Sequence, residues 1–302
     1  MKKRIGFLGV TTAVCLSLAA SLAQAAVTGG TAQRIHLRYS NRPSLNDPAL
    51  RSSAALVLDL SNSSVLYSRR SDVALPIASI TKLMTALVVM EADQPLDEML
   101  AVTADDRSFG KGSFSRLAPG TQLSRSDLMH LALMASENRA AHALGRNYPG
   151  GIAACVLAMN AKARELGMTS AHFVEPTGLS DENVASPEDL SKLVMAAAKV
   201  AEIRDYSTDS DFTVRVGRHQ VRYRNTDSLV SKPDWNIVVQ KTGYIHEAGR
   251  CLVMQTVIDD RPMVIVLLNS YGKRTRVADA RRVRRWVEAT LLAHDSGTAT
   301  TT

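Results

Sequence analysis

The chain has 302 residues, of which 45% are hydrophobic and 22% are charged, a composition typical of one large globular domain or two small ones. Aromatic residues make up only 5%, which argues against a nucleic-acid-binding surface built on base stacking. The formal net charge is +7, but three of the basic residues lie in an N-terminal segment that we expect to be removed. The remainder carries 33 basic and 29 acidic residues, too small an excess for a dedicated polyanion-binding protein.

Residues 1–25 have the three parts of a secretory signal peptide. Lys2-Lys3-Arg4 is followed by an apolar run from Ile5 to Leu22 and then by Ala23-Gln24-Ala25, a small-residue cleavage site. The run is short and rich in small residues, so we expect no transmembrane anchor after cleavage. Export to the periplasm argues against cytosolic metabolism and against a soluble nucleotide cofactor.

The following segments predict a mixed architecture. Residues 26–43 are polar and without periodicity, and we assign them to an exported leader or linker. Two apolar runs, 54–61 and 64–70, flank Asn62-Ser63 and predict a β-hairpin. Helical patterns then follow at 79–91, 125–146, 151–166 and 187–204.

In the C-terminal third, the spacing of the hydrophobic residues changes to every second residue. Alternating apolar residues predict an antiparallel meander with strands at 212–216, 219–224, 236–241, 250–257 and 263–269. A closing helix is expected over 277–294 and a disordered tail over 295–302. Strands at both ends with helices between them predict an α+β fold over 44–294. The first hairpin must return to the late strands, leaving the helices as a lobe with a cleft between lobe and sheet.

Two cysteines remain after signal removal, Cys155 in a helical pattern and Cys251 in a strand pattern. An oxidising compartment permits a disulfide, but two cysteines do not make a disulfide scaffold. We therefore favour two separately buried thiols.

Three Ser-x-x-Lys motifs occur: Ser79/Lys82, Ser108/Lys111 and Ser270/Lys273. Only the first opens a helical pattern, where side chains at i and i+3 share a face. A hydroxyl and an amine held together there make a nucleophile and its base. The alternative is a helix-capping serine with a surface lysine.

Two further motifs follow in order. Ser136-Glu137-Asn138 is a Ser-x-Asn at the end of an apolar helix, and alone it is explained by helix-end capping. Lys241-Thr242-Gly243 ends a predicted strand, where glycine allows a ligand backbone to approach closely. The Lys-Thr-Gly triplet is rare by chance in this composition.

In this order the motifs resemble those of penicillin-binding proteins and β-lactamases. Phe173–Ser180 with Asn183, and Lys241–Tyr244 with Glu247–Cys251, are similar to signatures of low-molecular-mass penicillin-binding proteins. The resemblance covers about residues 44–292. It implies a β-lactamase/transpeptidase-like fold, with an antiparallel sheet flanked by helices, an all-helical lobe, and the active-site cleft between them.

The resemblance also implies residue roles in a serine D,D-peptidase that acts on peptidoglycan peptides and is acylated by β-lactams. The predicted catalytic residues are Ser79, Lys82, Ser136 and Asn138. The predicted substrate-binding residues are Lys241, Thr242, Gly243, Tyr244 and Arg250. No cofactor or metal is expected. Because lysine has an ordinary pKa of about 10.4, Lys82 must be shifted downward to act as a base, and burial and the charge of Lys241 are the expected causes.

Within this family the chain is most similar to the D-alanyl-D-alanine endopeptidase type, the penicillin-binding protein 7 type. Carboxypeptidase relatives usually carry Asn-Asp-Ala after the motif serine, whereas this chain has Asn138-Arg139-Ala140. They also usually append a β-domain, but only 59 residues follow Gly243. A D,D-carboxypeptidase remains the alternative.

Other classes are disfavoured. A class A β-lactamase would need a Glu-x-x-x-Asn segment between Asn138 and Lys241, and none occurs there. The seven histidines include no His-Glu-x-x-His zinc motif. A non-catalytic wall-binding module would be expected to lack one of the three motifs. The last predicted helix carries four arginines that suit either anionic lipid or, as we favour, a solvated face: Arg281, Arg282, Arg284 and Arg285.

Overall fold

The computed structural model describes residues 38–39, 47–107 and 115–298, with side chains described from 47 to 107 and from 115 to 292. These residues belong to one unit of the chain. The predicted signal peptide and nearly all of the predicted leader lie outside the described residues, so those boundaries stay predictions.

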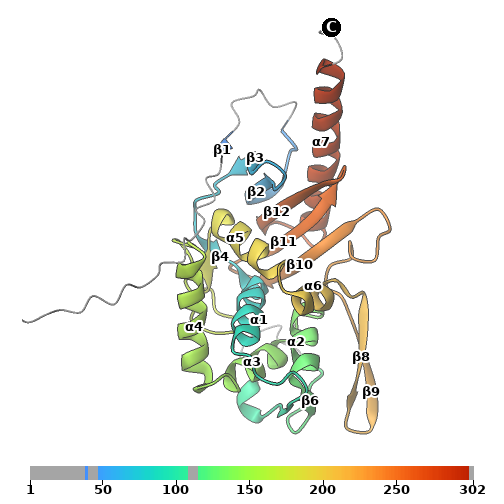
Figure 1. The fold of residues 1–302 in the computed structure, drawn as a ribbon. Coiled ribbons are helices and arrows are strands. Elements are labelled where there is room, and N and C mark those ends of the chain that lie inside the picture. Colours follow the sequence, from blue (N-terminus) through green and yellow to red (C-terminus); the bar gives the residue numbers. More distant parts are fainter. Residues whose placement is uncertain (1–37, 40–46, 108–114, 299–302) are drawn as a thin grey trace, which may run out of the picture. The chain divides into compact units, whose positions relative to one another are not determined.

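In the described part of the chain, a central sheet of six strands has the order β1-β3-β2-β12-β11-β10 (Figure 1). Its five long strands are antiparallel: β2 (Ser52–Asp59), β3 (Ser64–Arg69), β10 (Asn236–Ile245), β11 (Gly249–Ile258) and β12 (Arg261–Ser270). β1 (Arg38–Tyr39) adds parallel to β3. β12 pairs with β2, with Ile265 opposite Val57, so the first hairpin does return to the late strands as predicted.

Both faces of the sheet are covered, which is why β2 is hydrophobic along most of its length. Successive side chains point to opposite faces, and Leu56 lies in one core while its neighbour Val57 lies in the other. Helix α7 (Thr275–Thr298) packs on the Val57 face and α5 (Pro187–Ala197) on the Leu56 face. α7 continues four residues past the predicted domain end at 294.

The remaining helices form a lobe that continues the Leu56 core: α1 (Thr81–Glu91), α2 (Arg125–Met134), α3 (Asn138–Arg146), α4 (Gly151–Glu165) and α6 (Ala201–Thr208). α1 contacts every other helix of the lobe, so nearly all of its side chains are buried. Short strand pairs and turns complete the described chain: β4 (Leu75–Pro76) with β7 (Val184–Ala185), β5 (Met99–Ala101) with β6 (Gln122–Ser124), η1 (Ala78–Ile80) and η2 (Ala104–Asp106). None of the described helices is long and apolar enough to cross a bilayer.

The prediction of a five-stranded meander is wrong for its first two strands. β8 (Asp211–Val216) and β9 (His219–Arg224) form a separate hairpin that extends beside α2, outside the central sheet (Figure 1). Only Val214 and Tyr223 of this hairpin are buried, and the other positions are exposed or half-buried. The alternating pattern identified the strands, but the same pattern arises in a half-solvated hairpin and in a sheet strand.

Two predicted helices are each divided. The pattern over 187–204 contains all of α5 and the start of α6, because Val200 adopts an extended backbone and redirects the chain. The pattern over 125–146 is interrupted between α2 and α3 at the Ser-x-Asn motif.

The two cysteines are free and buried, Cys155 in α4 and Cys251 in β11, which confirms the favoured prediction over a disulfide. Burial raises the pKa of Cys155 to about 12 and that of Cys251 to about 11. Both thiols are therefore protonated and unreactive at neutral pH.

Candidate active site

Ser79 lies in the single turn η1, directly before α1, and is partly exposed. Lys82 lies one turn further on and is 1% exposed. Its Nζ donates to Ser79 Oγ at 2.9 Å. The first Ser-x-x-Lys therefore brings a reachable hydroxyl and a buried amine together, as its helical position predicted.

The other two motifs of this type have different surroundings. Ser108 and Lys111 lie outside the described residues. Ser270 ends β12, where its hydroxyl is 2.6 Å from Ser52 Oγ, and Lys273 is exposed beyond the strand.

The Lys82 amine is held by three oxygens. Besides Ser79, it donates to Asn138 Oδ1 at 2.8 Å and to the carbonyl oxygen of Thr177 at 2.5 Å. Burial lowers the pKa of Lys82 to about 8, partly opposed by the negative charges of Glu175 and Glu137. The amine is therefore a competent general base close to neutral pH.

Ser136 explains why the predicted long helix is broken. Its φ of +59° is in the left-handed region, so the helix cannot continue through it. Glu137 then caps α3 by accepting from the backbone N–H of Arg139 at 3.3 Å. Asn138 is the first residue of α3 and faces Lys82, while the half-exposed Ser136 hydroxyl has no hydrogen-bond partner among the described residues.

The Lys241-Thr242-Gly243 segment of β10 lies against η1. A Cβ on Gly243 would be 2.8 Å from the carbonyl oxygen of Ile77 and 3.3 Å from the backbone nitrogen of Ser79. Only glycine lets the strand approach Ser79 this closely. Three motifs that are far apart in sequence thus converge on Ser79.

Lys241 is fully buried and donates to the carbonyl oxygen of Thr242 at 3.0 Å. Burial lowers its pKa well below the ordinary value, and the positive charges of Lys82 and Arg276 lower it further. The prediction that the charge of Lys241 lowers the pKa of Lys82 is wrong, because burial alone lowers it. Both buried lysines therefore lose their protons more readily than an exposed lysine does.

The loop from Glu175 to Asn183 packs against the turn that carries Ser79. Gly178 has a φ of +80°, and a Cβ there would be 1.9 Å from the carbonyl oxygen of Ala78, so no side chain fits. Glu175 accepts from the backbone N–H of Thr177 at 2.7 Å, and Asn183 donates to Glu175 Oε1 at 2.9 Å. These hydrogen bonds fix the loop whose Thr177 carbonyl oxygen accepts from Lys82.

Arg276 is a site residue that sequence reasoning missed. It lies in the first turn of α7 and donates from Nη1 to the carbonyl oxygen of Gly243 at 3.0 Å. The predicted residues Tyr244 and Arg250 lie on the rim, where the Arg250 guanidinium is 4.4 Å from the centre of the exposed Tyr244 ring. No short motif connects Arg276 to the strand, so only the fold reveals this contact.

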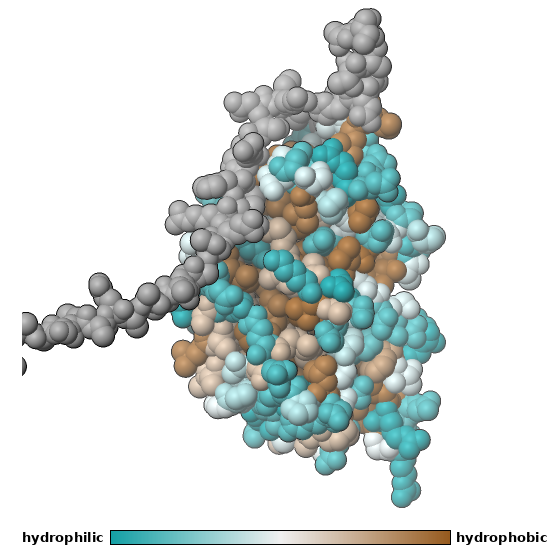
Figure 2. Space-filling model, viewed as in Figure 1, coloured by the Kyte–Doolittle hydropathy of each residue, from teal (hydrophilic) through white to brown (hydrophobic). Residues whose placement is uncertain are grey.

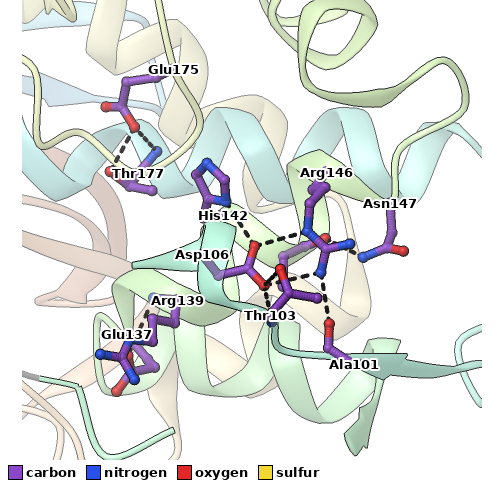
Figure 3. A network of polar contacts seen from close by, with 11 residues as sticks. Ala101, Thr103, Asp106, Glu137, Arg139, His142, Arg146, Asn147, Glu175 and Thr177 are labelled. Atoms are coloured by element: carbon purple, nitrogen blue, oxygen red, sulfur yellow. Dashed lines mark hydrogen bonds and ion pairs between the residues drawn. The ribbon is translucent and has the colours of Figure 1, made fainter. Parts of the chain in front are cut away.

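A buried carboxylate anchors α3, the helix that begins at Asn138. Figure 3 shows His142 and Arg146 pointing to Asp106, with Nδ1 of His142 2.8 Å and Nε of Arg146 3.1 Å from Oδ1. Asp106 also accepts from the Thr103 backbone at 2.7 Å. Burial alone would raise the pKa of Asp106, but these hydrogen bonds outweigh it and hold the pKa well below its ordinary value.

Replacing Asp106 with Ala is expected to lower the free energy of unfolding by about 2–3 kcal/mol, because His142 and Arg146 lose their buried partner. Urea unfolding followed by circular dichroism measures this loss. The exposed neighbour Asp105 is the matched control, and Asp105→Ala should change stability by less than about 0.5 kcal/mol.

The pH dependence of this loss has a definite sign. A carboxylate whose pKa is lowered by folding stabilises the protein above its unfolded pKa of about 3.9, and this contribution disappears as the pH falls below that value. The difference between wild type and Asp106→Ala should therefore shrink below about pH 4. Equal unfolding midpoints at pH 7 would contradict the anchoring role.

Together these groups suit acyl transfer. The site has a partly exposed hydroxyl, an amine with a lowered pKa, and a β-strand whose glycine lets an extended ligand approach. These are the parts of a serine hydrolase that uses lysine in place of histidine as its base. Among the described residues, no group of three or more histidine, cysteine or acidic side chains is arranged to hold a metal ion.

The comparisons agree with this class. Residues 41–272 match the Peptidase S11 family, described as D-alanyl-D-alanine carboxypeptidase, and the chain belongs to this family. It is 49% identical over 241 residues to a D-alanyl-D-alanine endopeptidase of Pseudomonas aeruginosa, covering 79% of this chain and 78% of the relative. It is 45% identical over 245 residues to one of Escherichia coli, covering 80% and 79%.

Solved structures confirm the predicted fold class. The Streptomyces K15 DD-transpeptidase superposes with a TM-score of 0.76 at 23% identity, covering 81% of this chain and all of the other. A D-alanyl-D-alanine carboxypeptidase from Mycobacterium tuberculosis gives a TM-score of 0.74 at 26% identity, covering 82% and 94%. The predicted family resemblance and the transpeptidase-like α+β architecture are thus confirmed.

Proposed function

We propose that this chain is a serine D,D-endopeptidase that cuts D-alanyl crosslinks in peptidoglycan through an acyl-enzyme. The observation that carries the chemistry is the 2.9 Å contact between Ser79 Oγ and the Lys82 amine, whose pKa is lowered to about 8. The endopeptidase activity rests on the relatives of that name in Pseudomonas aeruginosa and Escherichia coli.

The site geometry supports the following reaction. Ser79 Oγ attacks the D-alanyl carbonyl carbon while its proton passes to Lys82 Nζ. The tetrahedral intermediate collapses, the C–N bond breaks, and the proton on Lys82 passes through Ser136 to the leaving amine, so that Lys82 is neutral again. Water then attacks the ester carbonyl carbon and gives a proton to Lys82. The ester C–O bond breaks as Lys82 returns this proton to Ser79 Oγ, and the peptide is released with a free carboxyl group. Asn138 holds Lys82 in place throughout.

We assign the oxyanion to the backbone N–H groups of Ser79 and Tyr244. The close approach of Gly243 to η1 supports this assignment, because it leaves no room for a side chain between the two backbones. Thr242 and Arg250 then bind the anionic end of the substrate, and Arg276, which reaches the same strand, joins them.

A D,D-carboxypeptidase is the second candidate, since the Arg276 cation would suit a terminal carboxylate. Arg139, which replaces the Asp usual in carboxypeptidase relatives, donates to the carbonyl oxygen of Leu117 and so fastens a neighbouring loop. A β-lactamase is not favoured, because Glu175 accepts hydrogen bonds from the backbone N–H groups of Thr177 and Gly178 in its own loop.

Location and inhibition follow from the same proposal. The sequence of residues 1–25 supports export to the periplasm, where the crosslinked wall lies. β-Lactams mimic the D-alanyl amide and should acylate Ser79.

The deciding experiment compares two substrates at equal concentration. We expect purified mature protein to convert crosslinked muropeptide dimers into monomers faster than it releases D-alanine from pentapeptide monomers. Chromatography with mass detection follows both products. Rapid D-alanine release with intact dimers would refute the endopeptidase proposal while leaving the acyl-enzyme mechanism standing.

A further inference from the structure

A strongly cationic pocket opens beside the active site. Its volume is about 530 Å³, and none of the described residues that line it is acidic. Six of its lining residues are basic: Lys273, Arg274, Arg276, Arg281, Arg282 and Arg285. Such a concentration of one charge attracts anions and raises their local concentration.

Most of these cations are not used to hold the protein together. Lys273, Arg274, Arg281 and Arg285 are exposed, and their side chains have no ion-pair or hydrogen-bond partner among the described residues. Arg281 and Arg285 stand four residues apart on one face of α7, where like charges destabilise a helix. An anion bound from outside would relieve this repulsion.

Arg284, on the same helix, differs from these arginines because its side chain forms ion pairs within the protein. Arg284 is not one of the residues that line the pocket, and it pairs with Glu288 at 2.7 Å and with Asp234 at 3.4 Å. The unpaired arginines are therefore a feature of the pocket face and not of the whole helix.

The pocket is continuous with the substrate strand. Arg276 lines it and donates to the Gly243 carbonyl oxygen at 3.0 Å. Thr226 also lines it, and its hydroxyl is 2.6 Å from the hydroxyl of Thr242. A peptide that passes the Lys-Thr-Gly strand toward its anionic end thus arrives at the pocket.

We propose that this pocket binds the carboxylates of the second stem peptide of a crosslink, which is the peptide that leaves when the scissile bond is cut. The inference rests on the endopeptidase proposal above and names the part of the substrate that selects for it. From Arg276 to Arg285 the helix rises about 13 Å, at about 1.5 Å per residue. That distance accommodates about four extended residues, whereas a single leaving D-alanine spans only one.

The test uses the full mature enzyme with both Arg281 and Arg285 replaced by Gln. Because each exposed charge contributes modestly, we expect the KM for crosslinked dimers to rise about tenfold with little change in kcat. The rate of acylation by penicillin should stay within about twofold of the wild-type rate, since a β-lactam carries no second stem peptide. High salt should weaken dimer cleavage by wild type more than by the double variant.

Arg284→Gln is the matched control, and it should leave the KM for dimers unchanged. Circular dichroism shows that each variant is folded. A double variant with the wild-type KM on dimers would overturn the pocket assignment alone. A wild-type enzyme that is acylated but leaves dimers intact would refute the endopeptidase proposal and, with it, this inference.

One other outcome counts against the assignment. Vesicles containing anionic phospholipid are offered to wild type and to the double variant. If the substitutions abolish vesicle binding while dimer cleavage is unaltered, the arginine face is a lipid-binding surface and the peptide subsite is overturned.

Discussion

Ser79→Ala is expected to abolish covalent labelling by penicillin and to reduce kcat/KM for peptide cleavage by at least about 10⁴-fold. In the proposed mechanism the Ser79 oxygen is the attacking atom, and no other described serine has a buried lysine amine in contact with it. The protein should fold normally, because Ser79 is partly exposed and its loss leaves Lys82 bonded to Asn138 and Thr177. Gel fluorescence with a labelled penicillin and mass mapping of the acylated peptide provide the measurement.

Ser270→Ala is the matched control, since Ser270 also starts a Ser-x-x-Lys but is bonded to Ser52. It should keep full labelling. Label that persists in Ser79→Ala and maps to another serine would show that the nucleophile has been misassigned.

The acylation rate of the wild-type enzyme is expected to rise with pH, with an apparent pKa near 8. Lys82 must be neutral to accept the Ser79 proton, and a pKa of about 8 leaves about a tenth of the amine neutral at pH 7. At pH 9 about nine tenths are neutral, so the rate should increase about tenfold over this interval. Stopped-flow acylation with a chromogenic β-lactam measures the profile.

Two substitutions at Lys82 separate its charge from its basicity. Lys82→Ala should lower acylation by about 10³-fold and remove the rise with pH. Lys82→Arg keeps a hydrogen-bonding cation but cannot lose its proton at these pH values, so it should be similarly impaired. A pH-independent wild-type rate would mean that another group, such as Lys241, accepts the proton.

The sequence was most informative where a function depends on neighbouring residues of one element. Ser79 and Lys82 share a helix face, so their 2.9 Å contact follows from their spacing alone. Gly243 was predicted as a point of close approach, and it does lie against the Ser79 backbone. The family signature around Glu175 also marked a loop that supports the nucleophile.

Contacts between distant segments could not be predicted in this way. Arg276 and Gly243 are 33 residues apart, and Asp106 and Arg146 are 40 apart. Their pairing depends on how helices and strands pack, which no short spacing encodes. The left-handed backbone of Ser136 was missed for a related reason, since an apolar periodicity does not report a single residue that reverses the helix.

The position of β2 has a consequence for how the molecule folds. Ser52 and Ser270, bonded across β2 and β12, are 218 residues apart, and β2 lies in the middle of the sheet with β3 on its other side. Its hairpin with β3 forms locally, but its second edge stays unpaired until the last strand has been made. Such long-range pairing slows folding, and an exposed apolar strand edge invites association with other chains. A chain that is delivered N-terminus first, as the export proposal requires, must therefore be kept from aggregating until β12 has emerged and closed the sheet.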